Sequence, residues 1–171
     1  MEIFLNIIIM ILEIVYYTIF MKSARKEGNI KRYFLLFSLF TIITIFINRR
    51  FLINYLLIFF LILYGLKYIV KLKITLFDLF FIILMFMSKV IIEMPLSLLS
   101  YSIVENIYVA STMVGILKVI IVWLFNGYIE QIYEIMQMLW INNNFYIRYL
   151  FSVALFIYVI LSSVFLIVEW I

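Results

Sequence analysis

The hydrophobic positions of this chain fall into long runs that are separated by short polar segments. A helix needs roughly 20 apolar residues to cross the hydrocarbon core of a bilayer, and about 17 are enough. Six runs approach that length, so the pattern predicts an all-α, polytopic membrane protein built as a bundle of about six transmembrane helices. The predicted spans are 3–21, 33–48, 51–68, 74–93, 108–126 and 149–170.

Composition predicts a single transmembrane domain over residues 1–171. Hydrophobic residues make up 69% of the chain and charged residues 13%, and six spans would leave no room for a soluble domain. His and Cys are absent, which excludes disulfides, thiol nucleophiles, His-based acid–base catalysis and the commonest zinc ligands. The sequence also lacks a glycine-rich phosphate loop. We therefore expect no catalytic residues, no cofactor and no metal site.

Basic residues predict how the bundle is oriented. The segment 22–32 carries five basic residues and one acidic residue, and short basic loops stay in the cytoplasm. The residue usage is that of an AT-rich bacterial genome, so we expect a multi-pass protein of the bacterial cytoplasmic membrane with its N-terminus outside. Arg49 and Arg50, which this topology places outside, argue against it. The net charge of +4 is explained by such loops, and no nucleic acid partner is expected.

Two segments between the spans have a character of their own. Pro95 cannot continue a regular helix without a kink, so we expect the fourth helix to end near Glu93 and 95–106 to form an outer loop or short interfacial helix. The segment 127–140 is amphipathic, with polar positions 130, 134 and 137 on one face and apolar positions 132, 135, 136 and 139 on the other. It is either a helix at the membrane surface or the solvated end of the fifth helix.

Ionisable residues inside the spans are the candidate functional groups, because such residues turn inward to meet a partner or water. Glu13 and Lys118 lie at similar depths in the first and fifth spans. We predict that they form an ion pair across the bundle. Such a pair either fixes the registry of the helices or belongs to a ligand or ion site.

The fourth span carries a second set of charges. Asp78, Lys89 and Glu93 fall within roughly 60° of one another on a helix, which predicts one polar stripe. Asp78 is expected near the inner end, facing water, while Lys89 and Glu93 have the spacing of a same-helix pair. In the fifth span Ser111 and Gly115 share the face of the predicted buried lysine, and this small-residue spacing favours close helix contact.

A third set of residues is expected on the outer face. The predicted topology exposes Arg49, Arg50 and Glu105 outside the membrane. With no catalytic chemistry in the sequence, these charges are candidate binding residues for an extracellular ligand.

The segment 71–93, KLKITLFDLFFIILMFMSKVIIE, together with the basic first loop, resembles the polytopic sensor region of Agr-type quorum-sensing receptors, which are histidine kinases of the GHKL class. The resemblance covers nearly the whole chain and rests on hydropathy and charge placement. It implies detection of an extracellular peptide and transmission of that signal inward. The phospho-accepting His and the ATP-binding motifs of the kinase are missing from this sequence.

The sequence therefore predicts an integral membrane sensor or receptor module that detects an extracellular peptide or a small amphiphile and has no catalytic activity of its own. Two alternatives stay open: the substrate-binding membrane subunit of a vitamin-type importer, and a membrane scaffold or immunity-type protein. The expected partners are the lipid bilayer, a peptide ligand, and a second copy of the chain or a kinase or ATPase subunit.

Overall fold

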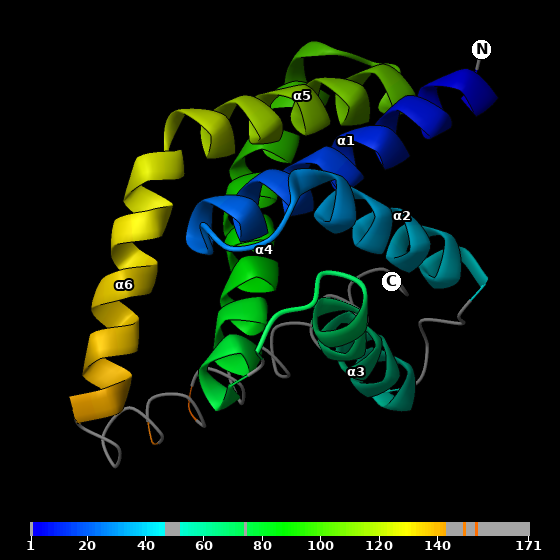
Figure 1. Ribbon diagram of the computed structural model, residues 1–171. Helices are drawn as coiled ribbons and strands as arrows, with labels where there is room; N and C mark the ends of the chain where they lie inside the picture. Colours follow the sequence, from blue (N-terminus) through cyan, green and yellow to red (C-terminus); the bar gives the residue numbers. More distant parts are fainter. Residues whose placement is uncertain (1, 47–51, 74, 143–148, 150–152, 154–171) are drawn as a thin grey trace.

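A computed structural model describes residues 2–46, 52–73, 75–142, 149 and 153. Within these residues the chain forms six helices, shown in Figure 1: α1 (Glu2–Ala24), α2 (Ile30–Phe46), α3 (Leu52–Tyr68), α4 (Leu76–Ile103), α5 (Ile107–Leu124) and α6 (Asn126–Asn142). The predicted sixth span, 149–170, falls almost wholly outside the described residues. The protein is all-α over its described part, as the hydropathy pattern predicts.

Three of the described helices are long and apolar enough to cross a membrane. They are Glu2–Ala24, Phe80–Ile103 and Ile107–Leu124, which belong to α1, α4 and α5. The helices α2 and α3 have 17 residues each, at the lower limit for a crossing. Three helices that are able to span a bilayer indicate a membrane protein, and the fuller six-span bundle stays a prediction.

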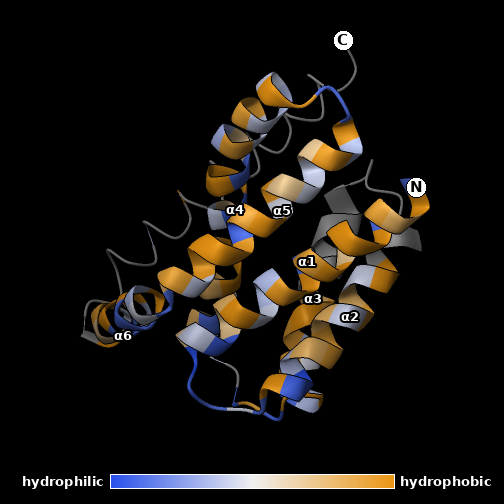
Figure 2. Cartoon of the chain, turned by 90° about the horizontal axis from the view of Figure 1, so that it is seen from above, coloured by the Kyte–Doolittle hydropathy of each residue, from blue (hydrophilic) through white to orange (hydrophobic). Residues whose placement is uncertain are grey.

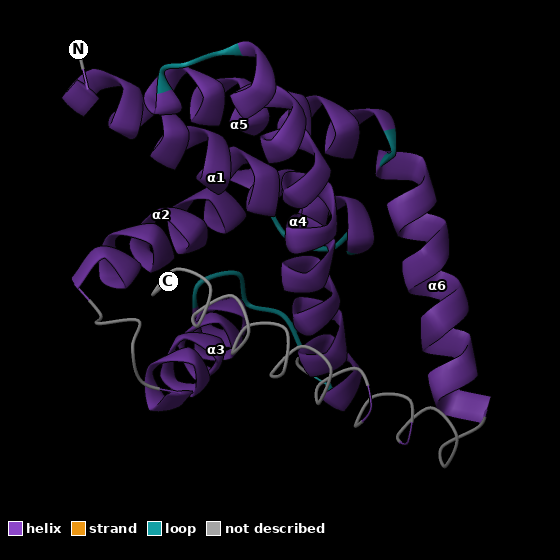
Figure 3. Cartoon of the chain, turned by 180° about the vertical axis from the view of Figure 1, so that it is seen from behind, coloured by secondary structure: helices purple, strands orange, loops and turns teal. Residues whose placement is uncertain are grey.

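The helix α1 lies at the centre of the described structure. It packs against α5, α2, α6 and α4, and Figure 2 shows it between α5 and α2. Two contacts show that α1 and α5 run in the same direction. Leu12 of α1 lies against Gly115 of α5, and beyond the C-terminal ends of the two helices Lys26 pairs with Glu130. Figures 1 and 3 show α4 crossing this pair of helices.

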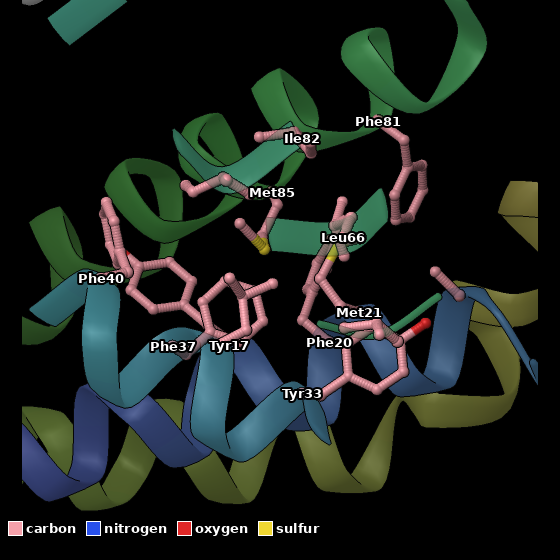
Figure 4. Packing of buried hydrophobic residues seen from close by; sticks show 14 of the residues in the cluster. Tyr17, Phe20, Met21, Tyr33, Phe37, Phe40, Leu66, Phe81, Ile82 and Met85 are labelled. Carbon is pink, nitrogen blue, oxygen red and sulfur yellow. The ribbon is translucent and has the colours of Figure 1, made fainter. Parts of the chain in front are cut away.

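Aromatic side chains fill the space between α1, α2 and α4. Tyr17 of α1 stacks on Phe37 of α2 with ring centroids 5.4 Å apart, and its edge meets Phe86 of α4 at 5.6 Å. Phe20 and Phe81 extend this contact between α1 and α4 at 5.5 Å, as Figure 4 shows for the labelled rings. Since lipid tails are as apolar as these side chains, such packing contacts, rather than hydrophobic exclusion, hold the helices together.

The helix α4 is longer than the sequence predicts. It runs through Pro95 to Ile103, so the predicted end near Glu93 is wrong. Residues 95–103 form neither an outer loop nor a separate interfacial helix but continue α4, and residues 104–106 connect α4 to α5. A proline removes one backbone hydrogen bond and crowds the carbonyl four residues earlier. Helices in a membrane tolerate this loss because neighbouring groups and local adjustments compensate for it. Asn106 then starts α5 by accepting hydrogen bonds from the backbone amides of Tyr108 and Val109 at 3.0 and 3.3 Å.

The amphipathic segment forms a helix of its own. Phe125 ends α5, and α6 begins at the next residue. Figure 1 shows α6 running down beside the lower half of α4, in a direction different from that of α5. Of the two arrangements that the sequence left open, continuation of the fifth helix is therefore excluded.

Two glycines let neighbouring helices approach closely. A Cβ atom at Gly65 of α3 would lie 2.0 Å from Leu36 Cδ1 of α2, and one at Gly115 of α5 would lie 2.9 Å from Leu12 Cδ1 of α1. Gly115 is the small residue that the sequence placed on the contact face of the fifth span. Small residues allow this approach because their backbone can touch a facing side chain directly.

We predict that Gly115→Leu lowers the free energy of unfolding by about 1–3 kcal/mol, the usual cost of overpacking, because the new side chain must displace Leu12. Gly127→Ala is the matched control, since nothing lies within 4 Å of its added Cβ, and we expect a change of less than about 1 kcal/mol. The stability of each variant is measured by heating it in detergent and recording the loss of its monodisperse chromatographic peak with temperature. Equal stability of the two variants would contradict a close α1–α5 contact.

Candidate functional site

Four charged side chains from the three membrane-crossing helices form one cluster, which we call the four-charge cluster: Glu13 of α1, Lys89 and Glu93 of α4, and Lys118 of α5. The Lys118 ammonium contacts the carboxylates of both Glu13 and Glu93. Lys89 Nζ lies 3.0 Å from Glu13 Oε2 and 3.8 Å from Glu93 Oε2. The predicted contact between Glu13 and Lys118 is thus present, and the structure adds Lys89 and Glu93 to it.

Burial differs within the four-charge cluster. The Lys118 side chain is 1% exposed, whereas Glu13, Lys89 and Glu93 are 20%, 27% and 28% exposed. Two carboxylates and two ammonium groups make the set formally neutral. Charges are costly in a low-dielectric interior unless they are paired, so the alternation of sign is what permits a lysine to be fully buried here.

Two tyrosines of α1 surround the two lysines. The Lys118 ammonium lies 5.0 Å from the ring centroid of Tyr16, and the Lys89 ammonium lies 5.8 Å from that of Tyr17. These are cation–π distances, at which the ring face attracts the charge. The Tyr16 hydroxyl also hydrogen-bonds Ser88 Oγ at 3.0 Å, which joins α1 to α4 beside the charges.

Asp78 does not belong to the same site as Lys89 and Glu93, so the predicted single stripe on α4 is wrong. Asp78 is 1% exposed rather than facing water, and its carboxylate lies 2.6 Å from the guanidinium of Arg25, which follows α1. It also accepts hydrogen bonds from the backbone and hydroxyl of Thr75 at 2.6 and 2.9 Å. The stripe divides because α4 crosses α1 and meets different parts of it at its two ends.

This second site, which we call the Arg25–Asp78 latch, also contacts α6. The Tyr133 hydroxyl donates to Asp78 Oδ1 at 3.4 Å, and the Tyr133 ring packs edge-on against Phe77 and Phe81 at 5.1 and 4.8 Å. Burial and, after it, the nearby Asp78 charge raise the pKa of Tyr133 to about 12. The phenol therefore stays neutral and can donate its proton to the carboxylate.

A polar groove lies at the same end of the described structure. Its volume is 340 Å³, and it is lined by Lys22, Ser23, Lys26, Asn126 and Glu130. Lys26 pairs with Glu130, whose hydrogen bond and charge raise the pKa of Lys26. Lys22 donates to the carbonyl oxygens of Lys26 and Gly28, which satisfies carbonyl groups where α1 ends.

Of the predicted outer-face residues, Glu105 is described by the structure, and it does not lie at these sites. Arg49 and Arg50 lie outside the described residues. Glu105 is exposed in the short connection between α4 and α5. Over the part of the chain that the structure describes, no three carboxylates gather closely enough to hold a metal ion.

The sequence indicates the charges of these sites but not all of their partners. Arg25 belongs to the basic segment 22–32, where its charge predicts topology, and nothing in the neighbouring residues marks it as the partner of Asp78. Thr75 and Asp78 do have the spacing of a capping box at a helix start, and that signal was available. Tyr16, Ser88 and Tyr133 could not be found, because hydroxyl groups of aromatic and small residues in apolar helices carry no pattern.

No protein-family model, curated protein or solved structure matches this chain.

We predict that Lys118→Met lowers the free energy of unfolding by about 3–5 kcal/mol, the cost of removing one partner from a buried ion pair, because two carboxylates would then share Lys89 alone. Lys31→Met, at an exposed position, is the control and should change stability by less than about 0.5 kcal/mol. Unfolding by SDS titration in mixed micelles measures both values.

The double variant Lys118→Met/Glu93→Gln tests whether charge balance is the cause. It leaves the neutral pair of Glu13 and Lys89, so it should be more stable than the sum of the single variants by about 0.5–3 kcal/mol. If the losses of stability in the two single variants simply added up in the double variant, Lys118 would act through packing alone.

We predict that Arg25→Met lowers the free energy of unfolding by about 3 kcal/mol, because the buried Asp78 carboxylate loses the one charged partner that it has in the described part of the chain. Tyr133→Phe should lower the free energy of unfolding by about 1 kcal/mol or less, since it removes one long hydrogen bond. Arg32→Met, at an exposed position of α2, provides the charge-matched control. The same micelle titration applies, and a loss in Arg32→Met equal to that in Arg25→Met would refute the latch.

Proposed function

We propose that the protein is an integral membrane receptor module that detects an extracellular peptide or a small amphiphile and has no catalytic activity of its own. In this proposal it resides in a bacterial cytoplasmic membrane with its N-terminus outside. The observation that carries the proposal is the four-charge cluster shared by three helices that are able to cross the membrane. Ionisable residues at such depth are retained mainly where they serve a ligand, an ion or a switch.

The exposed part of the four-charge cluster indicates the charge of the ligand. Lys118 is fully buried, while Glu13, Glu93 and Lys89 each keep about a quarter of their side chains accessible. The exposed groups are two carboxylates and one ammonium, so a ligand that reaches the cluster meets both carboxylates directly, while the buried Lys118 keeps the whole set formally neutral. A ligand with a cationic group and an apolar body would match this surface inside a membrane.

The four-charge cluster also offers a way for ligand binding at one helix to affect the contacts between the other helices. Glu13 has two ammonium partners and Lys118 has two carboxylate partners, each on a different helix. A cation that engages Glu93 would release Lys89 and Lys118 to Glu13 and so change which helices are paired. A ligand shifts such an equilibrium only by its differential affinity for the two arrangements, and here the arrangements differ in the two ion pairs of Glu93, one with Lys118 of α5 and one with Lys89 of α4.

The resemblance to the sensor region of Agr-type receptors supports the same function. It rests on the segment 71–93, which contains the start of α4 and the two α4 charges of the cluster. A receptor of this kind would pass its signal to a kinase partner or to a second copy of the chain.

A substrate-binding subunit of a small-molecule importer is the second candidate, because buried charges also mark substrate paths in transport proteins. It would copurify with an ATPase partner and would release its ligand to the other side of the membrane. A scaffold or immunity-type protein would use the same cluster only to fix helix registry.

The test measures binding to the full chain in lipid nanodiscs with two fluorescent peptides of equal length and apolar content, one carrying lysines and the other glutamates. We expect saturable binding of the lysine peptide. Glu93→Gln should weaken it at least about tenfold, since a hydrogen bond to a charged group is worth about 1.5–3 kcal/mol. Fluorescence anisotropy gives the dissociation constants.

Glu2→Gln is the matched control, because Glu2 is an exposed carboxylate at the start of α1, and it should bind as the parent chain does. Glu105→Gln shows whether the predicted outer-face carboxylate contributes. Absence of saturable binding, or equal binding by Glu93→Gln and the parent, would count against a receptor site at the cluster.

A further inference from the structure

The helix α6 has three faces, one more than its sequence pattern predicts. One face packs against α1 and α4 through Ile129, Tyr133, Met136 and Trp140. A second is polar and contains Glu130, Glu134 and Gln137. The third, which we call the apolar stripe, consists of Tyr128, Ile132, Ile135 and Leu139, and these side chains are between 50% and 63% exposed.

The sequence assigned Met136 to the same face as the stripe residues. In the structure Met136 is partly buried against the core, whereas Ile132, Ile135 and Leu139 remain exposed. At 100° per residue the centre of the apolar stripe lies roughly 160° from the centre of the polar face. The stripe therefore points away from the polar face and is not covered by the described part of the chain.

The roll of α6 about its own axis is fixed by contacts on the other two faces. Tyr133 packs between Phe77 and Phe81 and hydrogen-bonds Asp78. Trp140 stacks on Phe80 with ring centroids 6.2 Å apart. On the polar side Glu130 pairs with Lys26. These contacts hold the apolar stripe outward rather than letting it turn into the protein.

The position of α6 indicates what covers the stripe. It begins at Asn126, two residues after the end of the spanning helix α5, so its first turn lies where α5 leaves the hydrocarbon core. The basic residues Lys22 and Lys26 and the polar groove lie beside this turn. Cationic side chains at the end of a span lie at the level of lipid phosphates.

We infer that α6 lies in the membrane interface, with the apolar stripe inserted at the boundary between lipid headgroups and acyl chains and with the polar face toward water. The occupant of the stripe is the lipid of the same bilayer that α5 crosses. Three observations agree on this: continuity with a spanning helix, basic groups at headgroup level, and a stripe opposite a polar face. The placement holds whether or not the four-charge cluster binds a ligand.

The absence of Cys from the sequence allows the test to be made on the full chain by single-site labelling. Ile132→Cys, Ile135→Cys and Leu139→Cys carry a nitroxide on the stripe. Glu134→Cys, the immediate neighbour of Ile135 on the polar side, is the matched control. All four positions are exposed, so the label displaces no core side chain, and monodisperse elution of each labelled protein verifies folding.

The measurement compares collision of each nitroxide with oxygen, which concentrates in lipid, and with a water-soluble nickel chelate, in vesicles of phosphatidylglycerol and phosphatidylcholine. We expect the ratio of oxygen to nickel accessibility to be several-fold higher at 132, 135 and 139 than at 134. Equal ratios at 134 and 135 would place the stripe in water and overturn the inference. Low accessibility to both reagents on the stripe would show that a protein surface covers it, whether another segment of this chain, a second copy or a partner, and would equally overturn the inference.

Discussion

A charge that enters the hydrocarbon region needs an opposite charge at the same depth, and this constraint organises the described helices. The spanning helices α1, α4 and α5 each contribute to the four-charge cluster, so none of them can slide or turn without leaving a charge unpaired. Apolar packing alone would permit many arrangements of helices whose surfaces are chemically alike. The ion pairs select one of them, in the way that a buried polar residue fixes registry in a coiled coil.

The helix α4 is held at two levels, which gives it a central mechanical role. Near its start, Asp78 joins it to the end of α1 and to α6 through Arg25 and Tyr133. Eleven residues later, roughly 16 Å along the axis, Lys89 joins it to the middle of α1. A change of partners in the four-charge cluster would therefore act on the same helix that the Arg25–Asp78 latch fixes, which couples the membrane interior to the surface helix α6.

The two polar sites differ in a way that suits these roles. Asp78 is fully buried and surrounded by donors from Arg25, Thr75 and Tyr133, so it has one arrangement only. In the four-charge cluster, by contrast, Glu13 and Lys118 each contact two opposite charges on different helices, so the loss of one contact leaves each of them with another partner. In the proposed receptor, the buried anchor at one end of α4 would hold the helix in place while the charges further along it exchange partners in response to a ligand.

The sequence by itself determined the class of the protein, the extent of most helices, and the depth match of Glu13 and Lys118. These follow from local properties: the length of apolar runs, a rise of 1.5 Å per residue, and the cost of a charge in lipid. Only the tertiary structure decided that Asp78 leaves the polar stripe for Arg25 and that α4 continues through Pro95. It also decided which residues of α6 stay exposed. The reason is that the partner of Asp78 and the exposed face of α6 depend on how helices pack against one another, which no single helix encodes. The continuation through Pro95 depends on the surroundings that compensate for the lost hydrogen bond.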